Sequence, residues 1–253
     1  MPIVLVSQAM ADCDQSLTAV DADLREPLAR AGWTVIRDVH NPAECERLLQ
    51  GLGSLLPQYG GKLRHSVRFH PGFDDIQYSQ SANAITPHTE APGRNPPPRY
   101  IALHCHRQAR CGGGQTTLAD GYEFLRLLPE GLRDEAATRS IRFDLAAGAE
   151  ADAIAAPLVS RREGEVVVRY SYNVMRDGSL EGPARASDNG DDLDGIDFFE
   201  RELCRRGVEF SRRRGTPVLV PDDALLVIDN WRMLHSRPAY TDRNRHLTRY
   251  WVG

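Results

Sequence analysis

The amino-acid sequence predicts a mainly β protein, a barrel or sandwich of short strands framed by helices. Two observations carry this prediction. Many short strand patterns recur with helical patterns between them, and residues of chemical interest occur far apart in the chain. A length of 253 residues is ordinary for one large all-β or mixed domain. Since no repeat or linker divides the chain, we expect a single domain over residues 1–253.

The N-terminal part alternates helix and strand after a weakly patterned start. Residues 1–20 are expected to form a loose arm, followed by a helix over residues 23–31 and a strand over residues 33–39. A second helix begins at Asn41, which can cap its first turn, and Pro42 suits the first helical position. The apolar face of this helix is expected to consist of Leu48, Leu49, Leu52, Leu55 and Leu56.

The remaining elements follow from alternation and from turn residues. Strands are expected over residues 100–107, 165–172, 217–220, 224–229 and 246–252. A strand end that runs into a helix is expected over residues 118–128, with further helices over residues 130–139 and 196–206. Two loops, the Pro-rich 91–98 and the acidic 178–195, are either ordinary surface connections or lids over a site, because lids come from such long loops.

Composition excludes several classes of protein. A hydrophobic fraction of 41% and a charged fraction of 26% are typical of a soluble globular protein. The net charge of −4 argues against nucleic acid as a partner. No apolar run is long enough to span a membrane, and the first residues do not resemble a secretory signal. With five scattered cysteines, we expect a reduced, cytoplasmic protein in which cysteines are core residues.

One pattern indicates a metal site. His88 and Glu90 are two apart, so on a strand both side chains point to the same face, and His235 lies 145 residues after Glu90. Two histidines and one carboxylate leave coordination positions open, which suits ferrous iron that activates oxygen. Structural zinc sites usually have four protein ligands. Since this composition gives roughly one His-x-acid pair by chance, the triplet needs support from other motifs.

The last predicted strand places two arginines on one face. By alternation Arg245, Leu247, Arg249 and Trp251 point the same way. If that face is interior, each buried guanidinium needs an anion, and its planar fork suits a carboxylate. The alternative is an exposed basic edge strand, which resists aggregation.

Four motifs in order resemble those of a known enzyme family. They are His-Thr-Glu at 88–90, Gly-Gly-Gly-Gln-Thr-Thr-Leu-Ala-Asp at 112–120, Asp-Asn-Trp-Arg-Met-Leu-His at 229–235, and Arg-x-Leu-x-Arg at 245–249. Together they resemble iron(II)/2-oxoglutarate-dependent oxygenases of the taurine dioxygenase and clavaminate synthase type. The resemblance runs from about Gly32 to the end. It implies a double-stranded β-helix, or jelly roll, flanked by helices.

The resemblance also implies roles for individual residues. The iron ligands would be His88, Glu90 and His235. Thr116, or Thr117 beside it, would donate a hydrogen bond to a carboxylate of 2-oxoglutarate.

The resemblance also implies roles in binding the cosubstrate and the substrate. Arg245 would pair with the distal carboxylate of 2-oxoglutarate. Arg249 would face the pocket as a candidate for a substrate carboxylate or a second cosubstrate contact, and Asn83 would line the substrate side.

The implied reaction uses Fe(II), 2-oxoglutarate and O2 and releases succinate and CO2. Because Glu90 stands where related halogenases have a small residue, hydroxylation is the expected outcome, with desaturation, epoxidation or cyclisation as alternatives. The acidic ligand is Glu rather than the Asp of taurine dioxygenase, which favours the clavaminate synthase branch. We expect a small-molecule substrate, either free or bound to a carrier protein: an amino acid, an amino-acid derivative or a related metabolite.

Other readings of the sequence are weaker. His104, Cys105, His106 and Cys111 could form a zinc knuckle, but alternation puts Cys105 on the opposite face from the two histidines. A non-catalytic protein that binds metal or 2-oxoglutarate is disfavoured because the set of ligands and arginines is complete. A cupin-like dioxygenase without cosubstrate would have no use for Arg245. A hydrolase is disfavoured because no Gly-x-Ser-x-Gly motif occurs.

Overall fold

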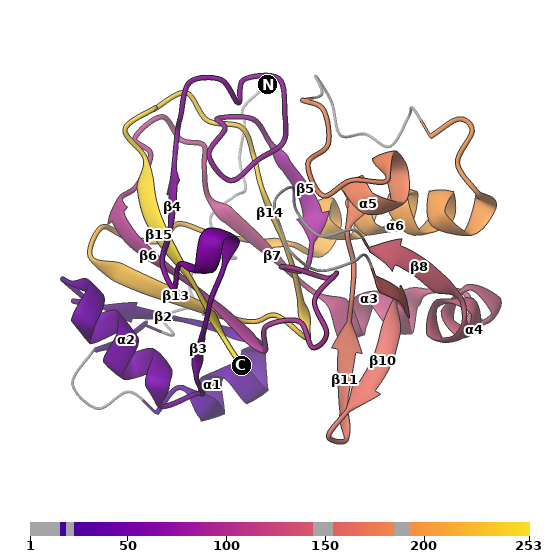
Figure 1. Cartoon of the computed structure of the whole chain (residues 1–253), viewed down its shortest axis with the longest axis horizontal. Coiled ribbons are helices and arrows are strands. Elements are labelled where there is room, and N and C mark those ends of the chain that lie inside the picture. The colour runs from indigo at the N-terminus through magenta and orange to yellow at the C-terminus, as the bar shows by residue number, and fades with distance from the viewer. Residues whose placement is uncertain (1–15, 19–22, 144–153, 185–192) are drawn as a thin grey trace, which may run out of the picture.

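Two facing antiparallel sheets form the centre of the molecule, and helices cover its outer sides (Figure 1). The structure is a computed structural model that describes residues 16–18, 23–143, 154–184 and 193–253. The predicted fold class, mainly β with flanking helices, is confirmed.

The larger sheet has the order β1-β2-β13-β6-β15-β3, and β4 also pairs with β15. Its strands are β1 Ser16–Thr18, β2 Trp33–Arg37, β3 Leu55–Leu56, β4 His65–Arg68, β6 Tyr100–Arg107, β13 Ala224–Asp229 and β15 His246–Val252. Apart from the parallel pair β1 and β2, neighbouring strands are antiparallel. The strands expected over residues 100–107, 224–229 and 246–252 are confirmed in full.

The smaller sheet has the order β12-β7-β14-β5. Its strands are β5 Ile85–His88, β7 Thr116–Asp120, β12 Thr216–Val218 and β14 Met233–Arg237. Two hairpins extend the structure on this side: β8 Ser140–Phe143 with β9 Ile154–Pro157, and β10 Val159–Arg162 with β11 Glu165–Val168.

Helices pack on both outer sides. In Figure 1, α1 Arg25–Ala31 and α2 Pro42–Gln50 lie beside the larger sheet. On the other side lie α3 Gly121–Leu127, α4 Glu130–Thr138, α5 Tyr172–Asp177 and α6 Phe198–Arg214. The predicted boundaries at Gly32 and Asn41 are confirmed. Gly32 has a left-handed conformation after α1, and the Asn41 side chain accepts a hydrogen bond from Glu44 N before α2.

The hydrophobic core has three parts. Between the sheets, Leu118 and Met233 pack with Leu226 and Leu247. A second cluster packs α1 and α2 against the larger sheet, and a third packs α3, α5 and α6 against the smaller one. The two sheets are therefore held face to face by apolar side chains, which fixes the residues that project between them.

Several predicted elements differ from the structure; among them, the strand expected over residues 33–39 ends at Arg37, and the strand expected over residues 217–220 is Thr216–Val218. The helix that begins at Pro42 ends at Gln50, so Leu55 and Leu56 are not on its apolar face. They form β3, because pairing with the C-terminal strand at Trp251 and Val252 overrides helical periodicity. The strand expected over residues 165–172 ends at Val168.

A cap explains the early end of that strand. The Ser171 side chain accepts a hydrogen bond from Val174 N and so begins α5. The helix expected over residues 196–206 is α6, which begins at Phe198 and continues to Arg214.

Some expectations fall on residues outside the described ones. The loose arm over residues 1–20 lies outside them except for Ser16–Thr18, which pair with β2. The loop over residues 178–195 is described at 178–184 and 193–195 only. Among the described residues, no helix is long and apolar enough to cross a membrane.

The cysteines follow the prediction only in part. Cys45, Cys105 and Cys204 are buried core residues, as predicted, whereas Cys111 is exposed. The cytoplasmic location stays a prediction.

Candidate metal centre

The three predicted ligands come together on the smaller sheet. β5 and β14 are adjacent and antiparallel, and His88 and His235 are register partners on them. Their ring centroids are 4.1 Å apart. One ligand atom from each of His88, Glu90 and His235 lies within 4.8 Å of the others, and this is the group with metal-ligand geometry among the described residues. Strand pairing thus joins two motifs that are distant in the sequence.

The ligand atoms are prepared for a metal ion. Nδ1 of His88 lies 2.9 Å from the Thr86 carbonyl oxygen, and because a carbonyl only accepts, Nδ1 carries the proton and Nε2 is left as the ligand atom. Nε2 of His235 lies 3.9 Å from Oε2 of Glu90. Burial lowers the pKa of both histidines, so both are neutral at neutral pH, the form that binds metal.

A cavity lies over these three residues. Its lining combines apolar groups of both sheets, such as Ile85 and Leu103, with a smaller number of polar groups. Ala91 comes from the 91–98 loop and Glu181 from the 178–184 segment, so both predicted lid loops reach the cavity. This mixture of apolar walls and a few polar groups is typical of a small-molecule site.

Arg245 is a buried cation without an anionic partner in the described part of the chain. It is 2% exposed and lines the cavity just before β15. Its Nε donates to the Gly114 carbonyl oxygen at 3.1 Å, while one terminal nitrogen has no hydrogen-bond partner among described residues. Burial lowers its pKa. A buried guanidinium of this kind is suited to bind an anion.

The glycine-rich motif makes room for this arginine. Gly114 has a φ of 78°, and a Cβ there would lie 3.1 Å from Cδ of Arg245. Thr116 is buried and lines the same cavity, whereas Thr117 does not. Of the two threonines, Thr116 is therefore the one that reaches the cavity, and its contact with 2-oxoglutarate stays a prediction.

Arg249 lies closer to the metal ligands. It is 6% exposed, and one terminal nitrogen lies 2.8 Å from Oε1 of Glu90. Its Nε donates to Oε1 of Gln58 at 2.9 Å, and within the described chain its other terminal nitrogen has no partner. Burial, the largest single cause, lowers the pKa of Arg249, but Glu90 together with Tyr59 and Tyr78 outweighs it, so the pKa is raised. Both arginines are therefore interior, and the exposed-edge alternative is wrong.

Asn83 lies next to the cavity wall rather than in its lining. Its amide nitrogen donates to the carbonyl oxygens of Asp74 and Ile76, at 2.7 and 2.8 Å. Its described role is to hold the segment that precedes the lining residues Gln77 and Tyr78. Contact between Asn83 and a substrate stays a prediction.

Sequence reasoning missed two polar residues beside the centre. Arg237 is buried, and it donates to the carbonyl oxygens of Ser81 and Asn83 at 2.7 Å each. Burial lowers its pKa to about 9. Asn230 contacts the backbone of Glu90. The position of Asn230 inside the 229–235 motif was the available signal; for Arg237 the only signal was its proximity to His235 in the sequence.

The second histidine pair does not form a metal site in the structure. Nε2 of His104 lies 2.7 Å from the Val39 carbonyl oxygen, and Nε2 of His106 lies 2.8 Å from Oγ1 of Thr248. Cys111 is exposed, and its sulfur accepts from Thr241 N at 3.4 Å. One nitrogen of each ring therefore contacts a neighbouring group, while Nδ1 of His104 has no hydrogen-bond partner among the described residues.

Two histidines and one carboxylate beside a cavity, with a buried arginine that has no anionic partner among the described residues, are typical of a mononuclear metal-dependent oxygenase. The sequence matches the family of taurine catabolism dioxygenases, TauD/TfdA, over residues 8–251. The chain belongs to this family. It is therefore a dioxygenase that uses Fe(II) and 2-oxoglutarate, and the predicted jelly-roll core is confirmed. Comparison with curated protein sequences found no match.

Solved structures share this fold. Asparagine oxygenase in complex with Fe(II), 2S,3S-3-hydroxyasparagine and succinate is 17% identical, with a TM-score of 0.71 over 90% of this chain and 77% of that one. OrfP, a non-heme iron oxygenase in complex with Fe and alpha-ketoglutaric acid, is 18% identical, with a TM-score of 0.65 over 90% and 77%. PvcB from Pseudomonas aeruginosa is 16% identical, with a TM-score of 0.59 over 90% and 78%.

Proposed function

We propose that the protein hydroxylates an unactivated carbon of a free amino acid or a close derivative of one. The main support is that His88, Glu90 and His235 place their ligand atoms around one point. Arg245 and Arg249 line the cavity beside them. The donor set fits ferrous iron, since it gives two neutral nitrogens and one carboxylate. The unpartnered nitrogen of Arg245 fits the distal carboxylate of 2-oxoglutarate.

The residues of this chain bind and orient the reactants. His88, Glu90 and His235 would hold the metal on one side, and Thr116 and Arg245, which line the same cavity, would hold the two ends of the cosubstrate. Fe(II), 2-oxoglutarate and O2, when bound, supply the oxidation of a C–H bond, with release of succinate and CO2. The apolar lining of the cavity disfavours water beside the metal, which reduces side reactions of the oxidant with solvent.

The charges in the cavity support an amino acid as the substrate. Arg249 has a buried terminal nitrogen without a partner in the described chain, which suits a carboxylate. Glu181 also lines the cavity and offers a carboxylate to an ammonium group. Asparagine oxygenase and OrfP are seen with hydroxylated asparagine and hydroxylated arginine, respectively. If Arg249 binds the carboxylate of the substrate, the substrate is a free amino acid, because in a thioester on a carrier protein this carboxylate is no longer present.

The loops over residues 91–98 and 178–184 are proposed to cover the bound substrate. Ala91 and Pro92 come from the first loop, and Leu180 and Glu181 come from the second. Both loops therefore provide wall residues without belonging to either sheet.

The proposal is tested with a panel of L-amino acids, each offered with its carboxamide, in the presence of Fe(II), 2-oxoglutarate and O2. We expect succinate formation to depend on one acid and its carboxamide to be a much poorer substrate. Arg249→Ala should remove this preference, because the group that reads the carboxylate is gone. Arg243→Ala is the matched control, since that arginine is exposed and pairs with Asp74.

Mass analysis of the product separates the alternative outcomes. Hydroxylation or epoxidation adds one oxygen atom, whereas desaturation or cyclisation removes two hydrogen atoms. Equal turnover of the acid and its carboxamide would contradict the role given to Arg249.

A further inference from the structure

Glu90 lies where regular strand pairing ends. β5 stops at His88, and the chain turns away at Ala91, whose φ is 48°. Each residue of the 88–90 triplet is nevertheless held. Nδ1 of His88 contacts the Thr86 carbonyl oxygen, and Thr89 exchanges hydrogen bonds with the backbone of Tyr170. The backbone of Glu90 needs another partner, because buried peptide groups are costly to leave unpaired.

The side chain of Asn230 forms the hydrogen bonds to the Glu90 backbone that a neighbouring strand would otherwise form. Glu90 N donates to Oδ1 of Asn230 at 2.7 Å, and Nδ2 of Asn230 donates to the Glu90 carbonyl oxygen at 3.0 Å. The same Nδ2 donates to the Pro98 carbonyl oxygen at 2.9 Å. The amide of Asn230, 1% exposed, therefore ties the carboxylate ligand to the end of the 91–98 loop.

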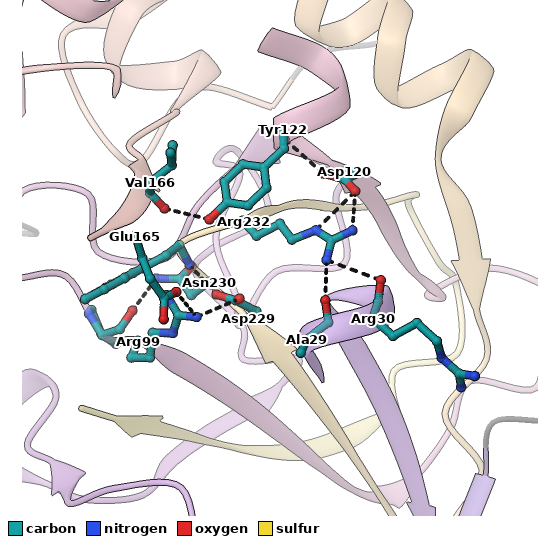
Figure 2. A network of polar contacts seen from close by, with 12 residues as sticks. Ala29, Arg30, Arg99, Asp120, Tyr122, Glu165, Val166, Asp229, Asn230 and Arg232 are labelled. Carbon is teal, nitrogen blue, oxygen red and sulfur yellow. Dashed lines mark hydrogen bonds and ion pairs between the residues drawn. The ribbon is translucent and has the colours of Figure 1, made fainter. Parts of the chain in front are cut away.

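Asn230 is itself fixed from several directions. Its backbone N donates to the Arg99 carbonyl oxygen at 3.0 Å. The neighbouring Asp229 pairs with Arg99 at 3.1 Å, and Arg99 also pairs with Glu165 (Figure 2). The indole of Trp231 donates to the Pro97 carbonyl oxygen at 3.1 Å.

The turn around Asn230 continues directly into the strand of the third ligand. Arg232 pairs with Asp120 at 2.6 Å (Figure 2), its carbonyl oxygen accepts from Gly121 N, and β14 with His235 begins one residue later. Asn230 thus connects Glu90 to the element that carries His235, although 140 residues separate Glu90 from Asn230.

We infer that Asn230 is a positioning residue of the metal centre, which sets the direction from which the Glu90 carboxylate meets the metal ion. The need for such a hold follows from Arg249, which lies 2.8 Å from Oε1 of Glu90. Without the hydrogen bonds from Asn230, the Glu90 carboxylate would turn toward Arg249 and away from the two histidines. The inference rests on the proposed function, because it requires Glu90 to be a ligand.

The test measures Fe(II) affinity of the apo-protein under anaerobic conditions, without turnover. We expect Asn230→Ala to weaken Fe(II) binding by about 10- to 100-fold, the usual effect of removing a group that orients a ligand. Asn230→Asp keeps the acceptor for Glu90 N but loses both donors, so an intermediate affinity is expected. Asn41→Ala is the matched control. It also removes an asparagine hydrogen bond to a backbone N–H, but on the remote helix α2, and should leave Fe(II) affinity unchanged.

A double-mutant cycle distinguishes positioning from general loss of structure. If Asn230 acts through Glu90, then Asn230→Ala should weaken Fe(II) binding little further in a Glu90→Ala background. Additive losses in the double variant, or a folded Asn230→Ala with wild-type affinity, would overturn the inference. If Asn230→Ala does not fold, the same cycle with Asn230→Asp decides.

The Glu90→Ala variant separates the two proposals. Unchanged Fe(II) affinity in that variant would overturn the ligand assignment, and the inference with it. Weakened binding in Glu90→Ala together with wild-type binding in Asn230→Ala would overturn the inference alone.

Discussion

Two pairs of histidine rings in this protein lie at similar distances but differ in their surroundings. His88 and His235 meet across β5 and β14, and His104 and His106 are two apart on β6. The ring centroids are 4.1 Å apart in the first pair and 4.4 Å in the second. Proximity of imidazoles therefore does not identify a metal site.

The difference lies in the carboxylate beside the first pair, since His104 also has one ring nitrogen, Nδ1, without a partner among the described residues. At His88 the protein occupies Nδ1 and leaves Nε2 directed toward Glu90 and His235. At His104 and His106 the Nε2 atoms contact a backbone carbonyl oxygen and a threonine hydroxyl, and no carboxylate completes a metal-ligand group among the described residues. A histidine is a ligand candidate when the chain leaves one nitrogen free and places an acid beside it.

The largest expected effect comes from removing a ligand of the first pair. His88→Ala or His235→Ala should abolish iron-dependent turnover and strongly weaken Fe(II) binding, because each variant loses one of the three candidate ligands, while circular dichroism shows a retained fold. His106→Ala should leave Fe(II) affinity unchanged. Retained iron-dependent turnover in both His88→Ala and His235→Ala would contradict the triad.

A smaller effect is expected at the cosubstrate end. Arg245→Ala should raise the 2-oxoglutarate concentration needed for half-maximal activity roughly tenfold to over a hundredfold, since a charge-assisted contact contributes about 1.5–3 kcal/mol. Iron affinity should stay the same, and Arg243→Ala should change neither quantity. An unchanged 2-oxoglutarate dependence would mean that another group binds the distal carboxylate.

The smallest expected effect is on the pH dependence of folding stability, through His106 of the second histidine pair. Burial lowers the pKa of His106 from 6.5 to about 4. Because the unfolded chain takes up this proton near pH 6.5 and the folded protein does not, His106 destabilises the fold as pH falls from about 6.5 to about 4. His106→Gln removes this term, so the stability of the wild type relative to the variant should decrease with acidification, by less than about 1.4 kcal/mol per pH unit.

Chemical denaturation of both proteins between pH 7 and pH 5 measures that difference. A stability difference that does not depend on pH would show that His106 titrates alike in the folded and unfolded states.

The sequence could predict the candidate metal residues, because their residue types and their order in the chain carry the signal. His88, Glu90, His235 and Arg245 are charged or metal-binding residues at interior positions, which leave a pattern. The final strand was equally clear, since its alternation extends over seven residues.

Short elements set by tertiary contacts were not predictable. Leu55 and Leu56 fit a helical face, but pairing with the last strand makes them β3. β5 is four residues long, and no local alternation marks it. The 229–235 motif includes Asn230 but does not reveal its partners, because these are backbone groups of Glu90 and Pro98.

The most direct test of the metal centre is anaerobic titration of the apo-protein with Fe(II) and then with 2-oxoglutarate, followed by visible absorption. A metal-to-ligand charge-transfer band that requires both additions is the predicted result, because it needs chelated 2-oxoglutarate on a metal with open positions. Iron binding without such a band would contradict the account and favour a dioxygenase that needs no cosubstrate. Absence of iron binding would contradict the triad itself.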